Sequence, residues 1–106
     1  MEIEAYASVK AWREDYIRTW GSSDPELPQR LRVLEGFCAF VGKDPDAMVS
    51  ECLREVDEGK RIRPKARRRY MDAIRDFEAE QASRIAGNVV RSFFIHNGVA
   101  MSADVL

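Results

Sequence analysis

The sequence predicts an all-α fold, a small bundle of four to five helices. Apolar residues recur every three to four positions in five segments, which is the spacing of a helix with one buried face. Glycine or proline stands at the junctions between these segments, and no segment has the apolar–polar alternation of a strand. With 106 residues, 45% of them hydrophobic and 33% charged, residues 1–106 are expected to form a single domain with its own core.

The first two predicted helices occupy the acidic N-terminal half of the chain. The first runs roughly from Glu4 to Trp20 and ends at Gly21. Its apolar face is formed by Val9, Trp12, Tyr16, Ile17 and Trp20. The second spans about Leu27–Val41 and ends at Gly42, and a capping box of Ser23 and Glu26 is expected before it.

The third predicted helix begins at Asp44 and Pro45, as N-cap and first helical residue, and ends at Gly59. Its inward residues are expected to be Met48, Val49, Cys52, Leu53 and Val56. The basic segment Lys60–Arg69 follows as a loop, and Pro64 is a suitable first residue for the fourth helix. That helix has an apolar face of Tyr70, Met71, Ile74 and Phe77, and an outer i, i+4 row of Arg68, Asp72 and Asp76.

The last predicted helix starts at an N-cap, Ser83, and stops at Asn97-Gly98. One face is apolar and is formed by Ile85, Ala86, Val89, Val90 and Phe93. Arg84, Asn88 and Arg91 fall on the opposite stripe, and Gly87 beside it is expected to let a nucleic-acid backbone approach closely. The pattern fits an ordinary amphipathic surface helix, and it also fits a helix that offers guanidinium and carboxamide groups to phosphates and base edges.

A single core is expected where these helices meet. Its predicted members recur at helical spacing on apolar faces: Leu31, Leu34, Phe37, Val49, Leu53, Ile74, Phe77, Val89 and Phe93. The three aromatic residues Trp12, Tyr16 and Trp20 either cap this core or meet a partner protein, and the sequence leaves both alternatives open.

The net charge of −1 hides a strong asymmetry along the chain. Residues 1–59 contain seven Lys/Arg and thirteen Asp/Glu, whereas residues 60–106 contain ten Lys/Arg and five Asp/Glu. Seven of those ten basic residues lie between Lys60 and Arg69. An acidic and a basic half indicate an anionic partner for the basic half, although a solvated charged loop gives the same pattern.

No catalytic or metal-binding pattern is present in the sequence. Cys38 and Cys52 stand in apolar helical patterns, which predicts buried free thiols and a reducing, cytoplasmic location. His96 is the only histidine, and it is expected to be a partly buried, hydrogen-bonded structural residue. We therefore expect a non-catalytic binding module with no metal, no cofactor, no small-molecule substrate and no membrane span.

Two segments of the chain resemble the SAM-like, core-binding domain of tyrosine recombinases, the phage-integrase family. The first is LRVLEGFCAFVGKDPDAM, a helix with two spaced aromatics and a Gly-Lys-Asp-Pro turn. The second is SRIAGNVVRSFFIHNGVAMS, which is similar to the closing helix of that domain. The resemblance covers roughly residues 12–102.

The resemblance implies a SAM-like orthogonal bundle that binds double-stranded DNA, clamps one side of the target duplex, and belongs to a site-specific recombinase or integrase. Catalysis in that family is performed by a separate domain, whose residues are absent from this chain, as in an excised domain or a truncated gene product. The predicted DNA contacts are Lys65, Arg67, Arg84, Asn88 and Arg91. Other recombinase protomers are further expected partners, through Trp12, Tyr16 and Trp20. A helical protein-interaction or dimerisation module and an RNA-binding bundle are the alternatives.

Overall fold

The protein is mostly helical, with five α-helices and one small two-stranded sheet among the described residues, which are residues 2–21 and 25–101 of the computed structural model. A short 3-10 helix, η1 (Ile3–Ala5), precedes the first α-helix. The other elements are, in chain order, α1 (Ala7–Trp20), α2 (Leu27–Val41), α3 (Pro45–Cys52), β1 (Leu53–Val56), β2 (Gly59–Ile62), α4 (Pro64–Gln81) and α5 (Arg84–Ile95).

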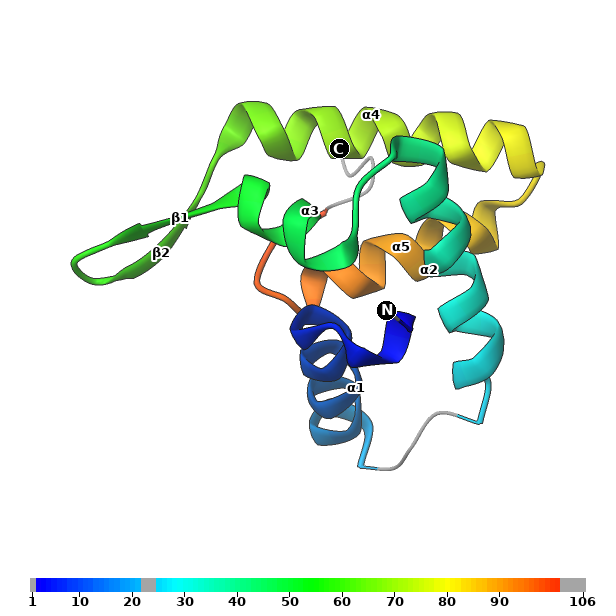
Figure 1. The fold of residues 1–106 in the computed structure, drawn as a ribbon, viewed down its shortest axis with the longest axis horizontal. Coiled ribbons are helices and arrows are strands. Elements are labelled where there is room, and N and C mark those ends of the chain that lie inside the picture. Colours follow the sequence, from blue (N-terminus) through cyan, green and yellow to red (C-terminus); the bar gives the residue numbers. More distant parts are fainter. Residues whose placement is uncertain (1, 22–24, 102–106) are drawn as a thin grey trace.

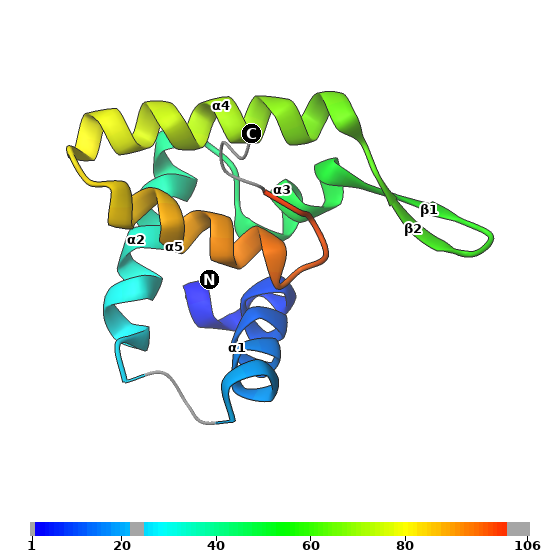
Figure 2. The same ribbon diagram turned by 180° about the vertical axis from the view of Figure 1, so that it is seen from behind.

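Helices α4 and α5 form the central pair of the bundle. They are joined by the short link at Ala82 and Ser83, and α5 runs back along α4, as Figures 1 and 2 show from opposite sides. The side chain of Ser83 caps α5 by accepting a hydrogen bond from the Ala86 N–H at 3.2 Å, as the sequence predicted. Helix α2 packs against both members of the pair, α1 packs against α5, and α3 lies against both α1 and α4.

The core is centred on α5. Phe93 and Phe94 are fully buried and contact each other with ring centroids 5.3 Å apart. Trp12 of α1 packs edge-on against Phe93 at 5.6 Å and donates its indole N–H to Ser92 Oγ at 3.2 Å. Seven of the nine predicted core residues are buried: Leu31, Leu34, Phe37, Ile74, Phe77, Val89 and Phe93. Val49 and Leu53 are partly buried and pack against the core from its edge.

The aromatic stripe on α1 divides between core and surface. Trp12 is buried, Tyr16 is half-buried, and Trp20 is 66% exposed. Tyr16 packs against His96 with ring centroids 6.2 Å apart, and His96 Nδ1 lies 2.5 Å from Asp15 Oδ2. His96 is therefore the partly buried, hydrogen-bonded residue that the sequence predicted, and it connects the end of α5 to α1.

The third predicted helix is shorter than expected, and this is the main correction to the sequence analysis. Asp44 and Pro45 do start α3, and Asp44 accepts from the Ala47 N–H at 2.7 Å. The helix ends at Cys52, however, and Leu53–Val56 pair with Gly59–Ile62 as an antiparallel hairpin. Gly59 therefore ends no helix: it is the first residue of β2, and its φ of +128° follows the hairpin turn at Asp57 and Glu58.

The first and last helices also differ from their predicted details. Helix α1 begins at Ala7, because residues 3–5 form the separate 3-10 turn η1. Ile85 was placed on the apolar face of α5 but is 75% exposed, because it lies at the edge of that face in the first turn of the helix. The capping box at Ser23 lies outside the described residues, whereas helix α2 begins and ends where the sequence placed it.

Truncation of Phe93 to alanine should destabilise the protein by about 3–5 kcal/mol, because it removes a fully buried ring and leaves a cavity. Ile95→Ala, two residues further on in the same helix, is the matched control, since Ile95 is half exposed and its truncation should cost well under half as much. Urea denaturation measures both free energies of unfolding. A loss below about 1 kcal/mol for Phe93→Ala would contradict the packing described here.

A second prediction concerns Asp46, whose carboxylate joins α3 to the start of α1. Ser8 donates to Asp46 Oδ1 from Oγ at 2.5 Å and from its backbone N–H at 2.8 Å. Partial burial raises the pKa of Asp46, but the hydrogen bonds from Ser8 and from the Ala7 N–H outweigh it and lower the pKa below its ordinary value of 3.8. The folded state therefore favours the ionised form.

Asp46→Ala should cost about 1.5–3 kcal/mol at neutral pH, the contribution of hydrogen bonds to a charged group. Because the folded pKa is depressed, this contribution is complete above pH 3.8 and is lost as the pH falls through the lower folded pKa. Denaturation curves of the parent and the variant should converge in that acidic range. Asp72→Ala, which removes an exposed carboxylate from α4, is the control and should change stability little.

Candidate nucleic-acid interface

An open groove lined mainly by basic side chains lies between the hairpin and the start of α4. Its lining residues come from the link between α2 and α3, from α3, from both strands, from the link before α4 and from the first turns of α4: Lys43, Glu51, Arg54, Arg61, Ile62, Arg63, Pro64, Lys65, Ala66 and Arg69. Six of these ten residues are lysine or arginine, and one is acidic. We call this surface the basic groove.

The local sequence explains why so many cations meet here. The segment Lys60–Arg69 was expected to be a loop, but its first residues form β2 and its remainder forms the start of α4. The hairpin turns the chain back on itself, and the Arg63 N–H donates to the Cys52 carbonyl at 2.7 Å. This bond holds the start of α4 beside the end of α3, so that Arg54 and Lys65, from elements on either side of the turn, line one surface.

Glu51 partly neutralises the basic groove. Lys43 Nζ lies 3.0 Å from Glu51 Oε2, Arg69 lies 3.8 Å from Oε1, and the Tyr70 hydroxyl donates to Oε1 at 2.9 Å. Partial burial raises the pKa of Glu51, but the hydrogen bonds from Lys43 and Tyr70 and the two cations lower it overall. Burial and the same carboxylate raise the pKa of Tyr70 above its ordinary value. Glu51 thus stays ionised and orders two of the six cations.

The other four cations of the basic groove make no ion pair with any described residue: Arg54, Arg61, Arg63 and Lys65. All four are exposed. Unpaired cations that line one concave surface attract an anion, and they do so most strongly where the anion has several charges in a row. The arrangement can therefore hold a polyanion, and it includes no nucleophile paired with a base.

The five predicted DNA contacts do not come together. Lys65 lies at the start of α4, inside the basic groove, whereas Arg84 and Asn88 lie at the start of α5, beside the far end of α4. The sixteen residue-to-residue steps from Lys65 to Gln81 span about 24 Å of helix. Both Arg84 and Asn88 are exposed, but they form a separate surface.

Arg67 and Arg91 are held by contacts within the protein. The Arg67 Nε donates to the Ala100 carbonyl at 2.5 Å and fixes the segment after α5, where Val99 and Met101 are buried. Arg91 was expected on the exposed stripe of α5, but its side chain is only 11% exposed. It donates to both oxygens of Glu78 on α4, at 2.6 and 3.3 Å, and to Asn88 Oδ1 at 3.1 Å.

Gly87 also has a different neighbour from the one the sequence suggested. It is buried, and a Cβ at this position would overlap the Glu78 side chain. The absence of a side chain therefore lets the carboxylate of α4 approach α5 and reach Arg91. The close approach that glycine permits here is between two helices of the same chain.

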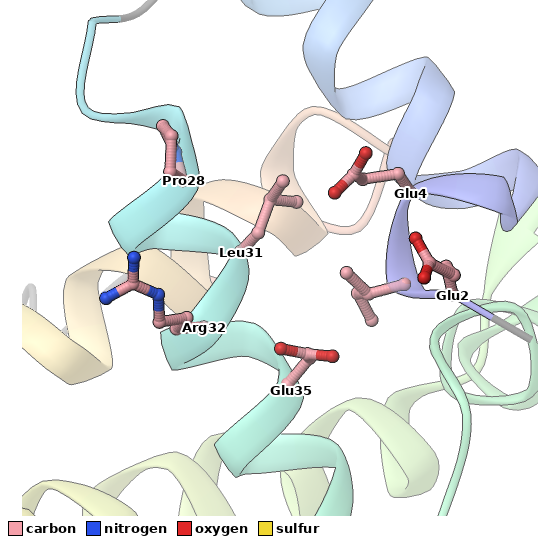
Figure 3. A pocket seen from close by; sticks show the side chains of 7 residues that line it. Glu2, Glu4, Pro28, Leu31, Arg32 and Glu35 are labelled. Atoms are coloured by element: carbon pink, nitrogen blue, oxygen red, sulfur yellow. The ribbon is translucent and has the colours of Figure 1, made fainter.

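A second hollow on the surface has the opposite charge. It lies between the N-terminal segment and α2, and Figure 3 shows three carboxylates, from Glu2, Glu4 and Glu35, around Leu31. Arg32 is the only basic residue that lines it. This hollow shares no residue with the basic groove, and its negative charge disfavours contact with phosphates.

The described residues contain no group of three or more histidine, cysteine or acidic side chains that could hold a metal ion. Cys38 and Cys52 are both free, and burial raises the pKa of their thiols to about 12 and about 11. Such thiols are poor nucleophiles at neutral pH. Within the described part of the chain, no helix is both long and apolar enough to cross a membrane.

Gly87→Ala should destabilise the protein by about 1–3 kcal/mol. The new methyl group displaces Glu78 from a largely buried ion pair, and that loss exceeds the roughly 1 kcal/mol that alanine gains over glycine within a helix. Gly36→Ala in α2 is the matched control, because a Cβ there meets only the Phe77 ring, with Cζ at 3.6 Å and Cε1 at 3.9 Å, which are ordinary contacts. Thermal unfolding should show opposite shifts for the two variants, and a stabilised Gly87→Ala protein would contradict the contact.

Comparison of the chain with family models, with curated proteins and with solved structures found no match. The candidate interface thus rests on the charge, exposure and arrangement of this chain's own residues.

Proposed function

We propose that this chain is a DNA-binding domain that holds one side of a duplex through the basic groove and performs no catalysis by itself. The observation that carries the proposal is the groove itself, in which four exposed, unpaired cations line one surface. The charge asymmetry of the chain supports it, since the acidic hollow at α2 leaves one part of the surface unfavourable to phosphates.

The resemblance of two segments to the core-binding domain of tyrosine recombinases supports a more specific form of the proposal. In that form the protein is the SAM-like domain of a site-specific recombinase or integrase, and it forms one half of a clamp around the target DNA. The mostly helical fold is compatible with such a domain. The hairpin between α3 and α4 gives the basic groove one of its two walls.

Duplex DNA fits the groove better than a small anion does. The unpaired cations come from both strands and from the start of α4, a distribution that suits an extended ligand. A duplex offers phosphates along each backbone with base edges between them, and the contacts to phosphates fix orientation without specifying sequence. Exposed aromatic side chains for stacking unpaired bases do not line the groove, which favours a duplex over single-stranded RNA.

A protein-interaction module is the alternative function, and one observation favours it. Trp20 and Ile17, at the end of α1, are 66% and 45% exposed. Trp12 does not contribute to such a surface, because it is buried against Phe93. Docking through Trp20 would depend little on salt, whereas phosphate binding releases counterions and weakens steeply as salt rises.

Arg63→Ala/Lys65→Ala should weaken binding to duplex DNA and lower the steepness of its salt dependence. Each lost phosphate contact removes about 0.9 from the slope of log K against log salt, so the double variant should lose about 1.8. Fluorescence anisotropy of a labelled duplex, titrated at several salt concentrations, measures both quantities. Arg84→Ala in the same assay tests the exposed start of α5 separately.

The control for charge alone is Arg13→Ala/Arg32→Ala, which removes two exposed cations that do not line the groove. It should keep the slope of the parent protein. If the groove variant binds as tightly as the parent, or if the parent shows no salt-dependent binding, the proposed function is wrong.

A further inference from the structure

The hairpin formed by β1 and β2 projects away from the helical body. Figures 1 and 2 show it as an arm that extends beyond α3 and the start of α4, with its turn far from the bundle. Only Leu53, Val56 and Ile62 are partly buried, and the remaining residues of the arm are exposed. A two-stranded hairpin of this length gains little stability by itself. The arm therefore contributes little to the core.

The two strands sort their charges onto opposite faces. Residues directly across an antiparallel pair point to the same side of the ribbon, and Arg54 is paired with Arg61. The next pair, Glu55 and Lys60, points to the opposite side and has opposite charges. One face of the ribbon therefore presents two arginines with no carboxylate, and the other presents a pair of opposite charges, Glu55 and Lys60.

Two like charges directly across a ladder destabilise a hairpin. Arg54 and Arg61 nevertheless occupy such a pair, and neither has an acidic partner among the described residues. An anionic or hydrogen-bond-accepting partner would relieve this repulsion. Both arginines also line the basic groove, so a ligand that is held in the groove also contacts them.

We infer that the hairpin lies in the major groove of the bound duplex, with the face of Arg54 and Arg61 turned toward the base edges. This inference rests on the proposed function. The major groove is about 12 Å wide and admits a two-stranded ribbon, whose strands are about 4.8 Å apart. Arg54 and Arg61 form the second pair from the helical end of the arm, and Arg61 lies about 7 Å along the strand from Arg63, so the two arginines can face the bases while Arg63 and Lys65 remain at the phosphates.

The charges of the arm favour a position in the major groove of the DNA over a position along its phosphate backbone. Asp57 and Glu58 form the turn, and both are exposed. A turn with two carboxylates would be repelled by a row of phosphates, whereas at the base edges a carboxylate accepts from the amino group of cytosine. Arginine forms paired hydrogen bonds to O6 and N7 of guanine in the same groove. The arm is thus a base-reading element, and the basic groove positions it.

Two labelled duplexes of identical sequence test this inference. One is unmodified, and in the other every cytosine has a glucosylated hydroxymethyl group on the ring carbon that faces the major groove. The parent protein should bind the modified duplex about tenfold more weakly, because the bulky substituent blocks the arm. Arg54→Ala/Arg61→Ala should bind the unmodified duplex about tenfold more weakly than the parent and should discriminate less between the two duplexes.

Arg13→Ala/Arg32→Ala is again the charge-matched control and should keep the parent's ratio of affinities. Equal, salt-dependent binding of the parent to both duplexes would overturn the inference and leave the proposed function intact. The same conclusion would follow if the Arg54/Arg61 variant were weaker on both duplexes with the parent's ratio unchanged, because the arginines would then contact phosphates only. Failure of the parent to bind either duplex would overturn the inference and the proposed function together.

Discussion

The packing of α5 against α4 is the constraint on which the rest of the structure depends. Helix α5 is buried on the side that faces α4 and the bundle, including both phenylalanines near its end. The ion pair between Arg91 and Glu78 joins the last turn of α4 to the middle of α5, and Gly87 leaves the space for it. Near the other end, Arg67 holds the Ala100 carbonyl. With both ends fixed, the start of α4 has one position relative to the core.

That position determines where the basic groove lies. Only Arg63 separates β2 from α4, so the end of the hairpin and the start of the helix lie together. The hydrogen bond from the Arg63 N–H to the Cys52 carbonyl joins them to the end of α3. The ion pairs of Glu51 with Lys43 and Arg69 strengthen this connection. The helical side of the groove is therefore held together by these contacts, whereas the hairpin beyond it is mostly exposed. A basic surface with a projecting two-stranded ribbon fits the shape of the proposed ligand, a DNA duplex with its major groove.

Arginines in this protein have two distinct uses. Arg91 and Arg67 stabilise the fold through hydrogen bonds to Glu78 and to a backbone carbonyl. Arg54, Arg61 and Arg63 are exposed and have no ion-pair partner among the described residues. This difference determines which arginines can be replaced to test binding, because removal of a fold-stabilising arginine would reduce binding through unfolding. Only replacement of the exposed arginines tests their direct contacts with a ligand.

The sequence by itself determined the helices with strong periodicity and clear caps. The limits of α2 and the N-caps Asp44 and Ser83 follow from local rules, and the core at Phe37, Ile74 and Phe93 follows from spacing. The hairpin was missed because its strands have four residues each, and Leu53 and Val56 fit a helical spacing as well as a strand. The signal available was Asp57-Glu58-Gly59 between Val56 and the Lys60–Ile62 segment, a hairpin turn with glycine at its end.

Only the tertiary structure decided which cations are available to a ligand. Arg84 and Arg91 look equivalent on a helical projection, but Arg91 faces Glu78, a residue thirteen positions earlier on another helix. Periodicity places a side chain on a face of its own helix, and it contains no information about the charge that a neighbouring helix presents there. The basic groove likewise depends on the return of β2 beside β1, which brings Arg54 and Arg61 together. The sequence determined the charge, and long-range packing determined where that charge is free to act.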